Sequence, residues 1–184
     1  MLRHLPNILT GLRLIAAPAL AVLLLHAMYN AALGIFVFAG LSDVADGYLA
    51  KRFKLATRFG RYMDPAADKL LMTISFVVLT WLGVVPLWLT MLVIARDLAI
   101  VLGIAVGHAM ELPMRVAPVT AGKLSTFVQV CYIGLMLLFL ALGAAWPMLA
   151  RGAAIACGAA TAISWLAYGQ IWLKAFLQKR NKPA

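Results

Sequence analysis

Four of the six acidic residues in this chain lie close together, and their spacing is that of helix positions that share one face. Asp43 and Asp46 are three residues apart, and Asp64 and Asp68 are four residues apart. Side chains at these separations project from the same side of a helix. The pattern therefore predicts two pairs of carboxylates, each on one helix face, which converge if the two helices are neighbours.

Converging carboxylates need positive charge beside them. An ionised Asp in hydrocarbon costs roughly 2.5 to 3.5 kcal/mol on insertion scales. Like charges about 4 Å apart repel by about 4 kcal/mol at an effective dielectric constant of about 20. Oxygen ligands without clustered His or Cys favour a hard cation, so we predict Mg²⁺ or Mn²⁺, with Ca²⁺ as the alternative in a looser cage. Four carboxylates can hold two such ions, which can bridge a pyrophosphate. The predicted metal ligands are Asp43, Asp46, Asp64 and Asp68.

Small residues are interleaved with these acids. Gly47 and Ala50 continue the face of the first pair, and Gly60 precedes the second pair. Glycine lets a bulky phosphate or nucleotide approach the backbone closely. The alternative interpretation is that the acids pair with nearby Lys and Arg side chains in a solvated loop. The helical spacing and the small residues favour the metal site.

The elements that position these residues are membrane helices, as the composition indicates. The chain has 184 residues, 65% of them hydrophobic and 12% charged, whereas soluble domains carry about 25% charged residues. Apolar stretches of roughly 20 residues, enough to cross a bilayer, recur along the whole length. We predict a single all-α transmembrane domain over residues 1–184, with a short interfacial segment at residues 3–7. The six predicted spans are 8–28, 31–52, 62–84, 86–110, 119–146 and 147–177.

Basic residues indicate the orientation of these spans. They crowd the connection after the second span, whereas the turns near residues 29 and 83 contain none. By the positive-inside rule that connection is cytoplasmic, and six spans then place both termini on the same side. Only Arg151 falls on the opposite side. The net charge of +10 is thus explained by topology and lipid headgroups, with no nucleic acid as partner. We expect an integral protein of a bacterial-type inner membrane.

The stretch from Asp43 to Asp68 resembles the signature of the CDP-alcohol phosphatidyltransferase family. The spacing of its four Asp, of Gly47 and of Gly60 is that of the family. One position departs, because Lys51 stands where the family has Arg, and Lys lacks the planar fork that grips phosphate. Arg52 is the neighbour that would compensate. The stretches 6–13 and 122–129 also look like features of the glycerophospholipid-making members.

The resemblance implies a six-helix fold, a homodimer, and a site open to the cytoplasmic leaflet. It implies that the four Asp hold two divalent ions on the pyrophosphate of CDP-diacylglycerol, and that Asp68 is also the base that deprotonates the acceptor hydroxyl. The hydroxyl then attacks the lipid-side phosphorus, and CMP leaves. The predicted contacts to CDP and its phosphates are Asn7, Thr10, Gly47, Ala50, Lys51, Arg52 and Gly60.

The shared signature does not choose the acceptor alcohol. Arg96 and Asp97 lie near the middle of the fourth span, and ions at that depth face a cavity or pair with each other. Both interpretations of Arg96 remain open, as an acceptor-site residue or as half of a local pair. The residues that we predict to bind the acceptor are Arg13, Arg96 and Lys123.

The acceptor is predicted to be of glycerol type. The Arg96-Asp97 pair, together with Lys123, Thr126 and Gln129, resembles the CMP-forming cardiolipin synthases, whose acceptor is phosphatidylglycerol. The alternative is glycerol 3-phosphate. Two other protein classes fit less well. A small transporter would scatter its acids among spans, and a prenyltransferase of the UbiA type needs two separate Asp motifs and more helices.

Overall fold

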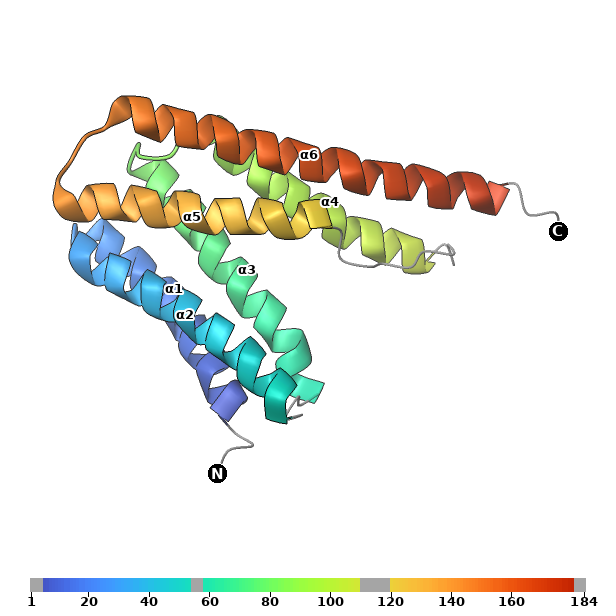
Figure 1. Cartoon of the computed structure of the whole chain (residues 1–184), viewed down its shortest axis with the longest axis horizontal. Coiled ribbons are helices and arrows are strands. Elements are labelled where there is room, and N and C mark those ends of the chain that lie inside the picture. Colours follow the sequence, from blue (N-terminus) through green and yellow to red (C-terminus); the bar gives the residue numbers. More distant parts are fainter. Residues whose placement is uncertain (1–4, 54–57, 110–119, 181–184) are drawn as a thin grey trace. The chain divides into compact units, whose positions relative to one another are not determined.

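The computed structural model describes residues 5–53, 58–109 and 120–180, and this part of the chain forms six helices with no strand (Figure 1). Within the helices, the side chains of residues 5–10, 43–53, 58–68, 108–109, 174–175 and 178–180 lie outside the description. The helices are α1 (Leu5–Leu25), α2 (Tyr29–Phe53), α3 (Arg58–Trp81), α4 (Leu87–Ala109), α5 (Thr120–Leu142) and α6 (Pro147–Arg180).

The predicted all-helical class is confirmed, and each predicted span coincides with one helix. The largest differences are four residues, where α3 begins at Arg58 rather than residue 62 and α5 ends at Leu142 rather than 146. At the chain ends, α1 begins at Leu5 rather than residue 8, and α6 continues to Arg180 rather than ending at 177. Hydropathy marks only the part of a helix that suits lipid, whereas helical hydrogen bonds continue into polar turns. The expected interfacial segment at residues 3–7 therefore overlaps the first turn of α1.

The count of six membrane crossings is confirmed in part. Three described stretches are long enough and apolar enough to cross a membrane, namely Leu87–Gly107, Thr120–Leu142 and Pro147–Leu173. The apolar stretches described in α1, α2 and α3 are shorter, at Gly11–Leu25, Tyr29–Ser42 and Lys69–Trp81. The remainder of α2 and of α3 carries the Asp motif, whose side chains lie outside the described residues.

Tight turns of one kind follow α1, α3 and α5. The backbone is left-handed at Ala27 (φ 57°), Gly83 (φ 73°) and Gly143 (φ 60°). In each turn the next amide donates to the carbonyl five residues earlier, at 2.8 to 3.0 Å. This is the Schellman arrangement, which satisfies carbonyls at a helix C-terminus. Each of these helices thus ends sharply and the next begins within a few residues.

The helices divide between two compact units, which are described one at a time; the expectation of a single domain remains a prediction. Unit 1 comprises residues 1–85 and 133–146. Within it, α1 packs against both α2 and α3. The buried residues of α1 are Arg13, Ala17, Leu20 and Leu24, separated by three or four positions so that they form one stripe. This stripe makes α1 the central helix of unit 1.

Unit 2 comprises residues 86–132 and 147–184, and in it α4 packs against α6. The ring of Trp88 lies against Gly158, and the ring of Trp172 lies against Gly103. Contacts therefore advance along both helices in the same direction, which means that α4 and α6 are parallel (Figure 1). Glycine allows each close approach because it has no side chain for the indole to displace.

The part of α5 in unit 2 runs in the opposite direction to α6. Gly122 in its first turn adjoins Tyr168, whereas Gln129, two turns later, bonds to Thr161. Three successive helices of alternating direction are what three successive membrane crossings require.

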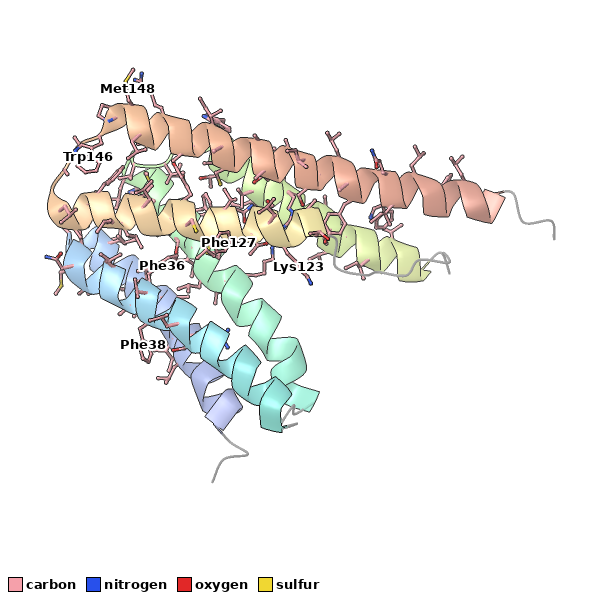
Figure 2. The ribbon with its side chains drawn as sticks, in the orientation of Figure 1. Phe36, Phe38, Lys123, Phe127, Trp146 and Met148 are labelled. Atoms are coloured by element: carbon pink, nitrogen blue, oxygen red, sulfur yellow. The ribbon has the colours of Figure 1, made fainter. Side chains whose placement is uncertain are left out.

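Large apolar side chains are exposed along the helices of both units. Phe38 on α2 and Phe127 on α5 are 57% and 65% exposed, and both are drawn in Figure 2. Soluble monomers rarely expose apolar surface this extensively. Lipid is the solvent that suits such a surface, so the outward-facing apolar residues agree with the membrane-spanning stretches.

Candidate active site

The four Asp of the predicted metal site lie on two helices of unit 1. The helix α2 carries Asp43 and Asp46 in its C-terminal half, and α3 carries Asp64 and Asp68 in its N-terminal half. The spacing of each pair is therefore realised on helical backbone, and both helices pack against α1. The side chains of all four lie outside the described residues, so their convergence remains a prediction.

The residues predicted to bind CDP lie on the same helices, also with side chains outside the described residues. Asn7 and Thr10 are on α1. The other five are on α2 and α3, and they are Gly47, Ala50, Lys51, Arg52 and Gly60.

The donor set of the Asp motif fits a hard divalent cation. Carboxylates supply only oxygen ligands, which Mg²⁺ and Mn²⁺ prefer. Among the side chains that the structure describes, no group of three or more His, Cys, Asp or Glu gathers elsewhere. The oxygen ligands that its carboxylates supply make the Asp motif the candidate metal centre.

Arg13 is buried in unit 1, with 1% of its surface exposed. It lies on the stripe of α1 that packs inside the unit, together with Ala17 and Leu20. A buried guanidinium is tolerated only where charge or hydrogen bonds compensate for lost hydration. Arg13 lies in the same unit as α2 and α3, the two helices that carry the Asp motif.

Arg96 is buried in unit 2, where it joins three helices. Its Nη1 donates to Asp97 Oδ1 at 2.7 Å, and its Nη2 and Nε donate to Ser164 Oγ on α6 at 2.8 and 3.2 Å. Nη2 also donates to the Gly122 carbonyl on α5 at 3.3 Å. The guanidinium carbon lies 5.7 Å from the centre of the Tyr168 ring, within cation–π range. The local pair with Asp97 is real, but it is only one part of the network.

Gly122 is the point at which α5 approaches this network most closely. A Cβ there would lie 2.8 Å from the Tyr168 hydroxyl oxygen and 3.2 Å from Nη2 of Arg96. The hydroxyl of Thr126 donates to the same Gly122 carbonyl at 3.1 Å. A glycine is therefore required for this carbonyl to reach Arg96 without displacing the tyrosine.

Lys123 follows directly and is exposed (Figure 2). Lys123 lies next to the Arg96 network, because the carbonyl of its neighbour Gly122 accepts a hydrogen bond from Arg96. An exposed cation at this position is accessible to an anionic ligand, and acceptor binding by Lys123 remains a prediction.

Gln129 belongs to a second buried cluster, between α5 and α6. Its side-chain nitrogen donates to Thr161 Oγ1 at 3.1 Å and to Ser125 Oγ at 3.3 Å. The Thr161 hydroxyl in turn donates to the Cys157 carbonyl at 2.8 Å. Because Ser125 and Thr161 are fully buried and Gln129 is nearly so, this cluster ties α5 to α6.

The sequence analysis missed Thr161, Ser164 and Tyr168. Each is a lone polar residue in an apolar helix, without a motif. A signal was nevertheless present, because these three are spaced by three and four positions on α6, as are Gly122, Ser125 and Gln129 on α5. Two polar stripes on otherwise apolar helices predict that the helices pack with those faces together.

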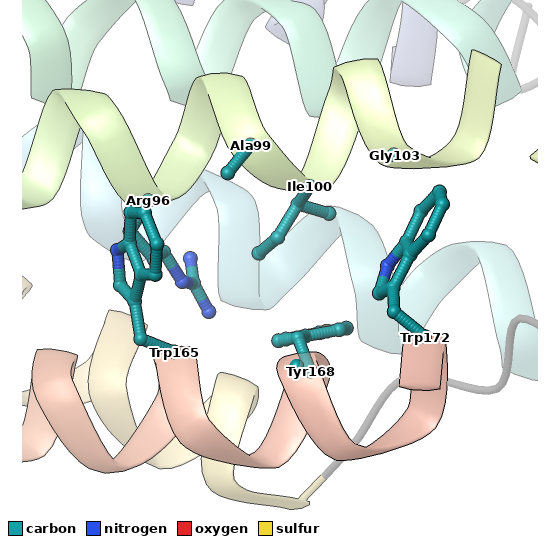
Figure 3. A pocket seen from close by; sticks show the side chains of 8 residues that line it. Arg96, Ala99, Ile100, Gly103, Trp165, Tyr168 and Trp172 are labelled. Carbon is teal, nitrogen blue, oxygen red and sulfur yellow. The ribbon is translucent and has the colours of Figure 1, made fainter. Parts of the chain in front are cut away.

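A cavity of about 230 Å³ lies beside Arg96, between α4 and α6 (Figure 3). Arg96 and Trp165 stand at one end and Trp172 at the other. The remaining walls are Ala99, Ile100, Gly103, Tyr168 and Gly169.

An apolar helical chain with paired carboxylates on two successive helices defines a membrane protein with a candidate site for phosphoryl chemistry. The sequence model of the CDP-alcohol phosphatidyltransferase family matches residues 3–172. The chain therefore belongs to the CDP-alcohol phosphatidyltransferase family.

The curated relatives of the chain include proteins named as phosphatidylglycerophosphate synthase and as cardiolipin synthase. A probable phosphatidylglycerophosphate synthase of Mycobacterium tuberculosis is 38% identical over 142 residues, covering 73% of this chain and 66% of the relative. A cardiolipin synthase (CMP-forming) of Homo sapiens is 34% identical over 128 residues, covering 69% and 40%. One of Streptomyces coelicolor is 37% identical over 116 residues, covering 59% and 54%. The chain thus spans less than two thirds of the length of each.

Proposed function

We propose that this protein transfers a phosphatidyl group from CDP-diacylglycerol to a glycerol-type alcohol and releases CMP. The observation that carries the proposal is the Asp motif, whose two pairs keep the family spacing on α2 and α3 in a chain that matches the family over residues 3–172. The membrane-spanning stretches support a lipid donor, because a diacylglycerol moiety partitions into the bilayer.

In this proposal Asp43, Asp46, Asp64 and Asp68 hold two divalent cations. When bound, such ions neutralise the negative charge of the pyrophosphate and of the departing CMP. Asn7, Thr10, Gly47 and Gly60 contribute backbone or side-chain groups that leave room for the phosphates. Lys51 and Arg52 add positive charge at the end of α2.

Asp68 is proposed to accept the proton of the acceptor hydroxyl. A bond forms between the acceptor oxygen and the lipid-side phosphorus, while the bond from that phosphorus to the oxygen of CMP breaks. The electron pair of the broken bond leaves with CMP, and the proton is transferred to the Asp68 carboxylate. A carboxylate within hydrogen-bond reach of the hydroxyl is the general base that this step requires.

Phosphatidylglycerol is the acceptor that we favour, which makes the protein a cardiolipin synthase. The cardiolipin synthases among the relatives support this choice. The Arg96 network also supports it, because Nη1 and Nη2 of Arg96 already donate hydrogen bonds to Asp97 and Ser164. A dianionic glycerol 3-phosphate would need more free cationic groups than this arrangement leaves.

Glycerol 3-phosphate is the second candidate acceptor, and the mycobacterial relative named as a probable phosphatidylglycerophosphate synthase favours it. Under either choice Lys123, Arg13 and Arg96 are proposed to lie on the acceptor side, with the product of each reaction an anionic phospholipid. We also propose that the enzyme works as a homodimer with its site and both termini on the cytoplasmic side of the membrane.

The reaction is tested with purified protein in lipid nanodiscs. CDP-diacylglycerol and Mg²⁺ are supplied with phosphatidylglycerol or glycerol 3-phosphate, and CMP release is followed. We expect release with phosphatidylglycerol and its loss on chelation by EDTA, with recovery on adding Mg²⁺. Release only with glycerol 3-phosphate would reverse the choice of acceptor, and release that EDTA does not affect would reject the metal mechanism.

The role of Asp68 is tested by Asp68→Asn, which keeps the size of the side chain but removes its basicity. We expect turnover to fall by about 10² or more, because a positioned base contributes 10²- to 10⁴-fold, while CDP-diacylglycerol binding largely remains. Glu111→Gln is the matched control, since it removes the one acidic side chain outside the Asp motif and Asp97. Near wild-type turnover of Asp68→Asn would exclude Asp68 as the base.

A further inference from the structure

The guanidinium of Arg96 is engaged almost entirely by its own chain. A guanidinium has five N–H groups, and four of those of Arg96 donate hydrogen bonds: one to Asp97, two to Ser164 and one to the Gly122 carbonyl. The ring of Tyr168 lies 5.7 Å from the guanidinium carbon, and Arg96 as a whole is 4% exposed. Little of this cation is therefore accessible to a ligand.

The hydrogen bond to Gly122 is the one that links Arg96 to α5. Ser164 Oγ accepts from both Nε and Nη2, and two bonds to one oxygen restrict rotation of the planar guanidinium. The same Nη2 donates to the Gly122 carbonyl at 3.3 Å. A Cβ at position 122 would lie 3.2 Å from Nη2, so α5 approaches the guanidinium as closely as a glycine permits. Arg96 and Ser164 together thus hold the first turn of α5.

Lys123 is the next residue of that turn, and its side chain is exposed (Figure 2). It lies at the start of Thr120–Leu142, a stretch long enough to cross a membrane. Near the end of such a helix a lysine side chain extends to the membrane interface. Both candidate acceptors present a phosphate there, one as a lipid headgroup and the other from water. The exposed Lys123 is therefore better placed to bind that phosphate than the buried Arg96.

We propose that Arg96 is a positioning residue for the acceptor. Its hydrogen bond to the Gly122 carbonyl holds the first turn of α5, so that Lys123 meets the phosphate of the acceptor. Ser164 contributes by orienting the guanidinium. The inference rests on the proposed function, and it makes Arg96 act through Lys123 rather than through contact with substrate.

Steady-state kinetics of the full chain in nanodiscs test this role. CMP release is followed with whichever of phosphatidylglycerol and glycerol 3-phosphate supports it, at varied acceptor and varied CDP-diacylglycerol. Ser164→Ala removes two hydrogen bonds from the guanidinium. We expect the KM for the acceptor to rise about tenfold, because small displacements of a binding group carry losses of this order or more. The KM for CDP-diacylglycerol should not change. A loss of folded protein alone would lower the maximal rate and leave both KM values unchanged, and an unchanged acceptor KM would overturn the proposal.

Thr161→Val is the matched control for Ser164→Ala. It also removes a buried hydroxyl from α6, but one that bonds to Gln129, two turns along α5 from Gly122. We expect its acceptor KM to equal that of the wild-type protein. An equal rise in both variants would assign the effect to the packing of α5 on α6 in general, and would overturn the role of Arg96.

A double variant decides whether Arg96 acts through Lys123. Lys123→Gln alone should raise the acceptor KM about tenfold, and adding Ser164→Ala should then raise it no further, because the group being positioned is already absent. If the two increases multiply instead, the guanidinium meets the acceptor independently of Lys123, and the proposal is wrong.

A spin label reports on the first turn of α5 without turnover. In a variant that lacks Cys131 and Cys157, a nitroxide is attached to a cysteine in place of Leu124, which is 59% exposed. Arg96→Lys should increase the mobility of the nitroxide, whereas Arg151→Lys should not. Unchanged mobility in Arg96→Lys would show that the guanidinium does not hold this turn.

Failure of the proposed function gives a different pattern. If the wild-type protein releases no CMP with either acceptor, the proposed function fails and the role of Lys123 fails with it. Normal CMP release together with an unchanged spin-label spectrum in Arg96→Lys would overturn only the role of Arg96.

Discussion

At the scale of single residues, Arg96 shows what a motif predicts and what it leaves out. Its position in the span and its neighbour Asp97 were enough to predict a buried ion with a local partner. The bonds to Ser164 and to the Gly122 carbonyl were not predictable from any motif, because they bring together residues 68 and 26 positions away. The Asp motif itself was recognisable because all its members lie within 26 positions of the sequence, on two successive helices.

The Arg96 network predicts coupled losses of stability. Arg96→Lys keeps the charge, but an ammonium cannot reach Asp97, Ser164 and the Gly122 carbonyl together, so we expect a loss of about 2 kcal/mol or more. Ser164→Ala should cost about 1 to 2 kcal/mol. The double variant should lose less than the sum, because both remove the same bonds. Thermal unfolding in detergent measures all three.

Arg151→Lys is the control for this cycle, because Arg151 is exposed and the same substitution there should change stability by less than about 0.5 kcal/mol. If the double variant lost the full sum of the stability lost by Arg96→Lys and Ser164→Ala, the guanidinium and the Ser164 hydroxyl would act independently.

At the scale of helices, hydropathy predicted the existence and order of all six but not how their faces pair. Alternating apolar spans and breaks are local properties, so Leu87–Ala109 and Thr120–Leu142 lie within a few residues of prediction. The parallel pairing of α4 with α6 depends on two indole rings that lie against glycines, at Gly158 and Gly103. Most residues on every face of these helices are apolar, so hydropathy alone did not identify the packed faces, although the polar stripe of α6 was a signal.

The turns between helices predict opposite effects of exchanging glycine and alanine. Ala27 holds the left-handed conformation that glycine holds in the two equivalent turns, a conformation that costs an L-residue roughly 1 to 2 kcal/mol. Glycine removes this cost but increases the conformational entropy of the unfolded chain, which offsets part of the gain. Ala27→Gly should therefore raise the free energy of unfolding by about 0.5 kcal/mol or more. Gly143→Ala should destabilise by about 1 kcal/mol. Unfolding temperatures in one detergent compare the two.

Gly152→Ala distinguishes the turn conformation from a general effect of glycine. Gly152 lies inside α6 with nothing within 4 Å of a Cβ, so alanine there should stabilise the helix by up to about 1 kcal/mol. If Ala27→Gly lowered the unfolding temperature, the left-handed strain at Ala27 would not be a cost to the fold.

At the scale of the whole chain, the six predicted crossings and the positions of the basic residues predict a membrane topology. Six crossings place the turns after α1, α3 and α5 on one side, and the basic connection between α2 and α3 on the other with both termini. In a variant without Cys131 and Cys157, a cysteine at Ala145 should react with an impermeant maleimide on intact cells. A cysteine at Ala56 or Lys182 should react only after permeabilisation.

Leu82→Cys is the matched control for Ala145, because it lies in the turn after α3 and should label on the same side. Labelling of residues 145 and 56 from the same side would contradict six crossings, and would require that one helix between them does not span the bilayer.

The adjacency of Arg96 and Asp97 also affects how the protein is made. Ser164 lies 68 residues after Arg96 in the sequence, so it is synthesised only after α4 is complete. A lone Arg at the centre of an inserting helix costs about 2.5 to 3.5 kcal/mol. Asp97 is the one partner already translated, so the ion pair can form before insertion. The Asp97 carboxylate would then compensate the charge of the guanidinium during insertion, until α5 and α6 insert and supply the other hydrogen-bond partners.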